Sequence, residues 1–167
     1  MYRTVDDFLA DWRQESESTL KVLRNVTDAS LGQRVTPEGR SIGRLAWHIV
    51  VSIPQMAHEA GLTAVEGSRD DEAAPANAAD ITAAYEAVAR SLTQAVIESW
   101  SDEQLAEEIP MYGETWTRGQ TLGVVVKHEI HHRAQLTVLM RQAGLVVPGC
   151  YGPAREEWAS MGMVPMA

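Results

Sequence analysis

Three of the five histidines in the chain lie within one short stretch, His128-Glu129-Ile130-His131-His132. The surrounding residues have helical periodicity, and residues four apart on a helix share one face. His128 and His132 can therefore each offer a ring nitrogen to one metal ion, at about 2.0–2.1 Å if the ion is zinc. Glu129, next to the pair, is a candidate base or a residue that supports the ligands. The stretch predicts half of a metal site.

His48 is the best candidate for a third ligand. It follows Trp47 in the segment Gly43-Arg-Leu-Ala-Trp-His48, on an apolar helix. Helical bundles build metal sites from side chains on facing helices. Three neutral imidazoles leave a tetrahedral ion with one open position, which is typical of catalytic zinc sites. We therefore predict that His48, His128 and His132 bind the metal.

The two remaining histidines leave alternatives. His131 could pair with His128 at a spacing of three residues in place of His132, and spacing alone does not exclude this arrangement. His58 lies ten residues beyond the proposed ligand on the same predicted helix, with a proline between them, so we expect it at the surface.

A metalloprotease is a further alternative, because His128-Glu129-Ile130-His131-His132 also satisfies the H-E-x-x-H pattern. The extended form of this motif needs glycine at 135 and histidine at 138, where the chain has Gln135 and Val138. The other form needs a glutamate ligand on a following helix, and only Glu156 and Glu157 remain near the chain end. The context therefore disfavours a protease.

Four segments carry apolar residues at helical spacing and begin or end at capping residues. They run from Thr4 to about Val26, from Ser41 to Gly61, from Asn77 or Asp80 to Val96, and from Thr117 to Ala143. No convincing strand alternation is present, and residues 111–116 are expected to form a turn or a brief extended piece. Residues 61–79 predict a long surface connection, whose run Ser68–Glu72 is expected to be solvated. We predict an all-α protein, a four-helix up-and-down bundle with a long connection between helices 2 and 3, as a single domain over residues 1–167.

The composition limits the partners. The chain has 167 residues, 45% of them hydrophobic, with a formal net charge of -9 and a pI near 5.0. This charge disfavours nucleic acid and anionic membrane surfaces. No apolar run approaches the roughly 18 residues of a membrane span, and the N-terminus has no signal-peptide pattern. With the single cysteine Cys150, which excludes an internal disulfide, these features predict a cytoplasmic protein.

The sequence resembles the DinB/YfiT-like family of metal-dependent enzymes over roughly residues 1–153. Three separated motifs carry the resemblance: Gly43-Arg-Leu-Ala-Trp-His48; the H-x-x-x-H-R-x-Q pattern of His128, His132, Arg133 and Gln135; and Gly144, Pro148, Tyr151 and Gly152. Ala134 departs from the family pattern, where glycine is usual. The resemblance implies a four-helix bundle, frequent homodimers, a role in stress response, and a zinc or nickel ion on His48, His128 and His132, with His131 outside the ligand set.

The resemblance also implies a function. Some relatives are metal-dependent transferases of low-molecular-weight thiols, and others are isomerases or hydrolases. We therefore expect a transferase with a small thiol as cosubstrate, or a hydrolase, acting on a small molecule. The alternative is a non-catalytic module that the metal stabilises. Tyr112, Trp116 and Tyr151 are candidate wall residues at the mouth of the site.

Overall fold

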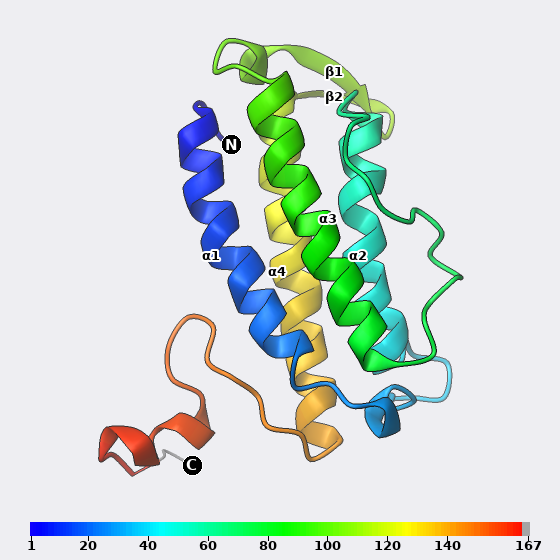
Figure 1. Ribbon diagram of the computed structural model, residues 1–167, viewed down its shortest axis with the longest axis vertical. Helices are drawn as coiled ribbons and strands as arrows, with labels where there is room; N and C mark the ends of the chain where they lie inside the picture. The colour runs from blue at the N-terminus through cyan, green and yellow to red at the C-terminus, as the bar shows by residue number, and fades with distance from the viewer. Residues whose placement is uncertain (165–167) are drawn as a thin grey trace.

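The structure, a computed structural model, describes residues 1–164. Within this range, four long α-helices form a bundle (Figure 1): α1 (Val5–Leu23), α2 (Ile42–Glu59), α3 (Ala78–Ser99) and α4 (Arg118–Gln142). Short 3-10 helices lie in the connections and the tail: η1 (Asp28–Ser30), η2 (Gln104–Ala106), η3 (Arg155–Glu157) and η4 (Ala159–Met161). The predicted four-helix bundle is confirmed.

Side chains cap the start of each long helix. The side chains of Thr4, Ser41, Asn77 and Thr117 each accept a hydrogen bond from the backbone N–H three residues later, at 2.8–3.2 Å. Such caps satisfy an amide donor that the first helical turn cannot pair internally. Asn77, and not Asp80, is therefore the cap of α3. Each cap fixes where its helix begins and hence which face every later residue occupies.

The long connection between α2 and α3 sets the direction of the helices. It returns along α2, where the Trp47 indole donates to the carbonyl of Asp70 at 2.8 Å. The helix α3 then begins beside the end of α1, because the Ala78 amide donates to the Asp28 carboxylate at 2.7 Å. As a result α2 and α3 run in one direction and α1 and α4 in the other (Figure 1). This order differs from the strict alternation of an up-and-down bundle.

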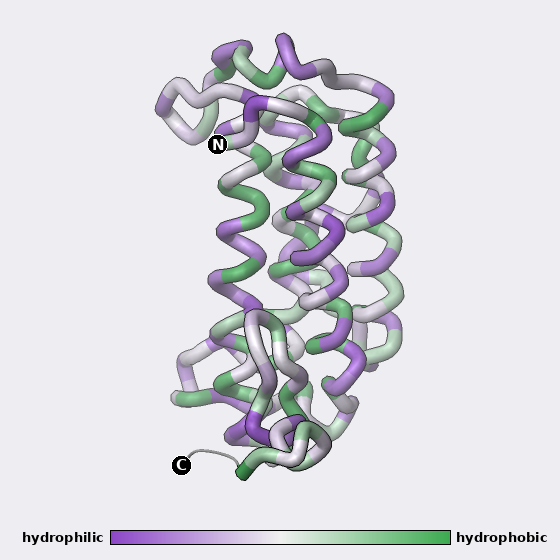
Figure 2. Tube along the Cα trace, turned by 90° about the vertical axis from the view of Figure 1, so that its left-hand side faces the viewer, coloured by the Kyte–Doolittle hydropathy of each residue, from purple (hydrophilic) through white to green (hydrophobic). Residues whose placement is uncertain are grey.

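The core lies between the four helices. Along the helices, hydrophobic and hydrophilic residues alternate within each turn or two (Figure 2), so each helix turns an apolar side inward. Fully buried large side chains include Phe8, Trp12, Ile49, Ile53, Ile81, Tyr85 and Leu92. Among residues 1–164 no helix combines the length and the apolar character that crossing a membrane requires.

A small β-hairpin precedes α4. Strands β1 (Glu108–Met111) and β2 (Glu114–Thr117) pair antiparallel across a two-residue loop. Tyr112 and Gly113 in this loop have φ of 52° and 84°, the left-handed values that suit the right-handed twist of a tight hairpin. The turn or brief extended piece expected at residues 111–116 corresponds to the loop and most of β2, whereas β1 was not expected, because four residues are too few to show alternation. The second strand ends at Thr117, so the hairpin leads directly into the cap of α4.

Candidate metal centre

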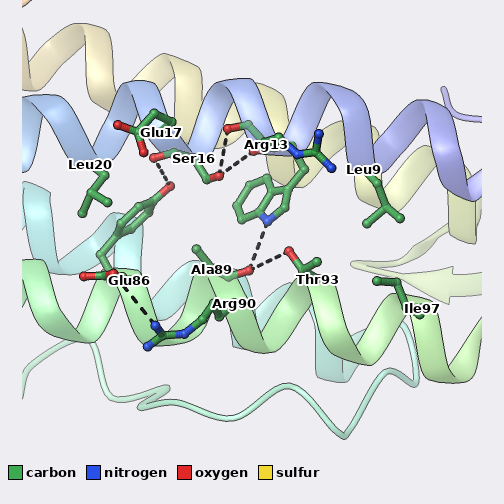
Figure 3. A pocket seen from close by; sticks show the side chains of 12 residues that line it. Leu9, Arg13, Ser16, Glu17, Leu20, Glu86, Ala89, Arg90, Thr93 and Ile97 are labelled. Carbon is green, nitrogen blue, oxygen red and sulfur yellow. Dashed lines mark hydrogen bonds and ion pairs between the residues drawn. The ribbon is translucent and has the colours of Figure 1, made fainter.

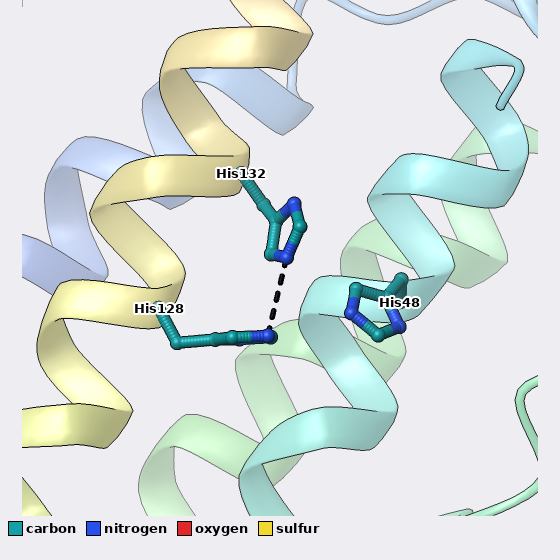
Figure 4. Close-up of side chains that lie close together, drawn as sticks. All are labelled: His48, His128 and His132. Carbon is teal, nitrogen blue, oxygen red and sulfur yellow. Dashed lines mark hydrogen bonds between the residues drawn. The ribbon is translucent and has the colours of Figure 1, made fainter. Parts of the chain in front are cut away.

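Three histidines from two helices converge in the bundle. His48 lies on α2, and His128 and His132 lie one turn apart on α4 (Figure 4). One ligand atom from each residue lies within 4.8 Å of the others. The Nε2 atoms of His128 and His132 are 3.1 Å apart, and a tetrahedral ion with bonds of about 2.0–2.1 Å would separate two ligand nitrogens by about 3.3–3.4 Å. The arrangement therefore fits a single ion with little movement.

The polar contacts of His128 support this fit. Its Nδ1 atom is buried and has no hydrogen-bond partner among the described residues. Its Nε2 atom lies 3.1 Å from the Nε2 atom of His132, so without an ion one of the two rings must carry its proton at Nε2 and donate it to the other. A cation between the rings would accept both lone pairs. The donor set, three imidazole nitrogens, suits zinc, nickel and related divalent ions.

Burial keeps the two rings on α4 neutral. It lowers the pKa of His128 to about 4, with further contributions from the neighbouring imidazoles and, last, from Arg40. Burial also lowers the pKa of His132, although the hydrogen bond that its ring donates to the Gln135 amide oxygen opposes the shift. Metal binding requires neutral imidazoles, so at neutral pH both rings have a lone pair available without losing a proton first.

Asp71 orients His48. Its Oδ1 atom lies 3.2 Å from Nδ1 of His48, and Arg44 donates to its Oδ2 atom at 2.7 Å. Arg44 also donates to Glu72 at 2.8 Å. A carboxylate that accepts from Nδ1–H fixes the ring so that Nε2 faces the ion and becomes more basic. The expectation that the run Ser68–Glu72 is simply solvated is thus wrong at Asp71, whose side chain is only 26% exposed.

Gln135 has the equivalent position beside His132. Its Oε1 atom lies 2.9 Å from Nδ1 of His132, and its Nε2 atom lies 3.0 Å from Nε2 of His131. Nδ1–H of His132 can therefore donate to the amide oxygen while the amide N–H donates to His131. His131 thus reaches the cluster through Gln135, and the structure brings His132, not His131, beside His48.

Glu129 lies on a neighbouring face of α4. It is fully buried, and its Oε1 atom accepts hydrogen bonds from Thr19 on α1 at 2.7 Å and Tyr85 on α3 at 2.9 Å. Its Oε2 atom has no partner among residues 1–164, and burial raises its pKa to about 7. One residue along a helix turns the side chain by about 100°, which directs this carboxylate toward α1 and α3. The predicted role of Glu129 as a base beside the histidines is therefore not supported.

Arg133 and Tyr151, two residues of the motifs that resemble the family, connect separate parts of the bundle through Glu15. The Arg133 guanidinium donates to the Glu15 backbone oxygen at 2.8 Å and forms an ion pair with the Glu15 carboxylate. The Tyr151 hydroxyl donates to the same carboxylate at 2.6 Å. These contacts tie α4 and the C-terminal tail to α1. Tyr151 therefore does not line the mouth of the histidine cluster.

Two of the hollows in the described part of the chain lie on different sides of the bundle. A cavity of about 520 Å³ beside His132 is lined by Val35, Gly39, Arg40, Leu45, Gln135, Val138 and Leu139. The other, about 380 Å³, is a groove between α1 and α3 that includes Leu9, Arg13, Glu17 and Ile97 and contains no histidine (Figure 3). Neither hollow includes Tyr112 or Trp116, which lie on the hairpin. The cavity beside His132 is instead bordered by the loop before α2, so these aromatic residues do not form its lining.

The other candidate ligands lie elsewhere. His58 lies outside the cluster but is partly buried rather than at the surface, and one of its ring nitrogens lies 2.8 Å from the carbonyl of Val65. Cys150 is a free, partly buried thiol in the tail. Among residues 1–164, the group that could hold an ion contains the three histidines alone. An ion there would lack a fourth protein ligand.

The sequence model of the DinB family matches residues 1–164. The protein YrdA of Bacillus subtilis (strain 168) is 40% identical over 163 residues, which cover 98% of this chain and 97% of YrdA.

Solved structures share the fold. A DinB-like protein from Bacillus cereus ATCC 10987 superposes with a TM-score of 0.87 at 40% identity, over 90% of this chain and 100% of that chain. YfiT from Bacillus subtilis superposes with a TM-score of 0.62 at 20% identity, over 84% of this chain and 87% of that chain. YfiT is described as a probable metal-dependent hydrolase with an unusual four-helix bundle topology.

Proposed function

The chain belongs to the DinB family, and from this membership we propose that it is a divalent-metal-dependent enzyme that acts on a small molecule. The observation that carries the proposal is the cluster of three histidines without a fourth protein ligand among the described residues, next to a cavity. A purely structural ion is normally enclosed by four protein ligands, whereas a catalytic ion keeps one position open. The open position therefore favours an enzyme over a non-catalytic module.

We propose zinc or nickel as the ion and hydrolysis as the reaction. When bound, a divalent ion on three neutral imidazoles supplies a Lewis acid that lowers the pKa of water or of a thiol toward or below neutrality. The description of YfiT as a probable metal-dependent hydrolase supports hydrolysis through fold similarity. Transfer to a small thiol cosubstrate would use the same open position, and is the alternative that experiment must separate.

The protein side chains have defined tasks in this proposal. Asp71 and Gln135 accept the Nδ1 protons of His48 and His132 and hold the opposite nitrogens toward the ion. The apolar side chains around the cavity reduce the access of bulk water on one side. Glu129 has no task at the reacting atoms, because its carboxylate is enclosed by Thr19 and Tyr85.

Metal analysis of the ligand variants tests the metal part. Purified protein should retain close to one zinc or nickel ion per chain when either ion is supplied. Replacing any one of His48, His128 and His132 with alanine should abolish tight binding, while His131→Ala and His58→Ala serve as matched controls that keep it. Metal retained by all three ligand variants would disprove the site.

A cobalt-substituted sample tests the reaction. Cobalt spectra report the ligands at the open position, so a small thiol that binds the ion introduces a sulfur-to-cobalt charge-transfer band. Hydrolysis without thiol transfer predicts no such band with a panel of cytoplasmic thiols, together with turnover of ester or amide probes. A strong band with turnover only in the presence of thiol would replace hydrolysis with thiol transfer.

A further inference from the structure

The cavity beside the histidines contains a cation without a partner. Arg40 is exposed at the rim of the cavity, which it lines together with His132, and its guanidinium forms no hydrogen bond or ion pair with any residue in the range 1–164. The neighbouring arginines differ, because Arg44 pairs with carboxylates and Arg34 donates to backbone carbonyl groups. A guanidinium at the rim of a cavity, with its five N–H donors not used by the protein, can bind an anion that enters the cavity.

The loop that carries Arg40 is held in place by its own hydrogen bonds. Arg34 donates to the Gly39 carbonyl at 3.1 Å, and the Gly39 amide donates to the Thr36 carbonyl at 3.0 Å. On the other side, Ser41 caps α2, the helix that carries His48. Arg40 therefore lies between a closed turn and a capped helix. Its backbone is fixed relative to the histidine cluster, which lets one ligand contact both.

The rest of the cavity is mainly apolar. Leu45 and Leu139 form part of its lining, and Val35 and Val138 contribute side chains that are 64% and 56% exposed. Large exposed aliphatic groups that border one hollow are characteristic of a binding surface. The volume of about 520 Å³ lies within the range of about 300–1,000 Å³ found for small-molecule sites.

We propose that this cavity binds a small molecule with an apolar body and a single carboxylate, and that Arg40 is the residue that selects the carboxylate. The guanidinium fork matches a carboxylate in two parallel hydrogen bonds, while the apolar body lies against Val35 and Val138. A single negative charge fits because the chain carries a net charge of -9 and repels polyanions. The assignment of this molecule as a substrate rests on the proposed function, which places the reacting group at the open position of the ion.

Calorimetric titration with two matched probes tests the proposal. 4-Phenylbutanoate and 4-phenylbutan-1-ol share the same apolar body and differ in the anionic group. The zinc-loaded protein should bind the carboxylate about tenfold or more tightly than the alcohol, as expected for a charge-assisted hydrogen bond. Arg40→Met should abolish this preference and leave the alcohol affinity unchanged, and Arg40→Lys should restore part of it. Arg13→Met, which removes the same charge from the groove between α1 and α3, should change neither affinity.

Repeating the titration on metal-free protein separates this inference from the proposed function. Because Arg40 belongs to the protein, a carboxylate preference should remain without metal, and should remain even if the metal proves not to be catalytic. A preference that disappears with the metal but survives in Arg40→Met would show that the ion, not Arg40, binds the carboxylate, and would overturn the inference. Tighter binding of phenyl phosphate than of the carboxylate would overturn the assignment of a single charge.

Discussion

Asp71 provides a sharp test of how the structure prepares the metal site. Its carboxylate lies 3.2 Å from Nδ1 of His48, although the two residues are 23 positions apart in the chain. Replacing Asp71 with asparagine keeps the size of the side chain and removes its charge. Replacing it with alanine also removes the acceptor. If the carboxylate orients and polarises His48, both variants should bind metal more weakly than the wild type.

The size of the effect follows from the geometry. Losing an outer partner of a metal-binding histidine typically lowers metal affinity by about 10–100-fold, or about 1.4–2.7 kcal/mol. Asp71→Asn should lie near the lower limit, because the amide oxygen can still accept from Nδ1–H and because the Asp71 side chain is 26% exposed and shared with Arg44. Asp71→Ala should lie nearer the upper limit.

The assay is competition with a chromophoric chelator for zinc, measured beside the variant Glu72→Gln. Glu72 pairs with the same guanidinium of Arg44 but does not contact His48, and its side chain is 87% exposed. Glu72→Gln should therefore bind zinc as the wild type does. Thermal unfolding of the metal-free proteins shows whether each variant keeps its fold.

Two results would refute the reasoning. Wild-type affinity in Asp71→Ala would mean that His48 needs no carboxylate partner. Equal weakening by Glu72→Gln would mean that the effect comes from anchoring the connection through Arg44 rather than from the hydrogen bond to His48.

Three further predictions concern stability, each measured by chemical denaturation. Arg133→Met should destabilise the fold by about 3–5 kcal/mol, because it leaves a buried carboxylate of α1 without its ion-pair partner, and an unchanged midpoint would contradict that role. The folded-state pKa of Glu129 is raised from 4.5 to about 7, so the folded state holds the carboxyl proton more tightly than the unfolded state does. The free energy of unfolding of the wild type should therefore fall by about 3 kcal/mol, relative to that of Glu129→Gln, as the pH rises from 4.5 to 8. Parallel pH profiles of the two proteins would contradict the raised pKa. In Gly119→Ala the new Cβ atom would lie 2.2 Å from the Tyr2 backbone oxygen, so a loss of about 1–3 kcal/mol is expected, whereas Gly123→Ala, with its nearest atom at 3.6 Å, should be tolerated or stabilising.

The sequence by itself determined the parts of this protein that depend on local geometry. The helix caps at Ser41 and Thr117 follow from the hydrogen-bonding needs of a first turn, which involve residues only three apart. The pairing of His128 with His132 follows in the same way, because four residues make about one helical turn. Spacing still left His131 as an alternative, because an interval of three is also nearly one turn.

Tertiary structure decided which side chains from distant segments meet. Whether His48 joins the pair depends on α2 facing α4, and no local pattern encodes that contact. Asp71 reaches His48 only because the long connection returns along α2. A residue of an acidic run that was expected to be solvated therefore contacts the Nδ1 atom of a proposed metal ligand.

The same reason explains why the face of each residue on α4 could be assigned but its surroundings could not. Glu129 is adjacent to His128 in sequence, yet the packing of α1 and α3 against its face buried it away from the cluster. Likewise, the loop before α2 lies beside His132 and lines the cavity with Arg40, whereas the hairpin with Trp116 does not line it. Helical periodicity is set by bonds within a few residues of chain, but the neighbours of each face are set by how whole helices and connections pack, and that depends on the entire sequence at once.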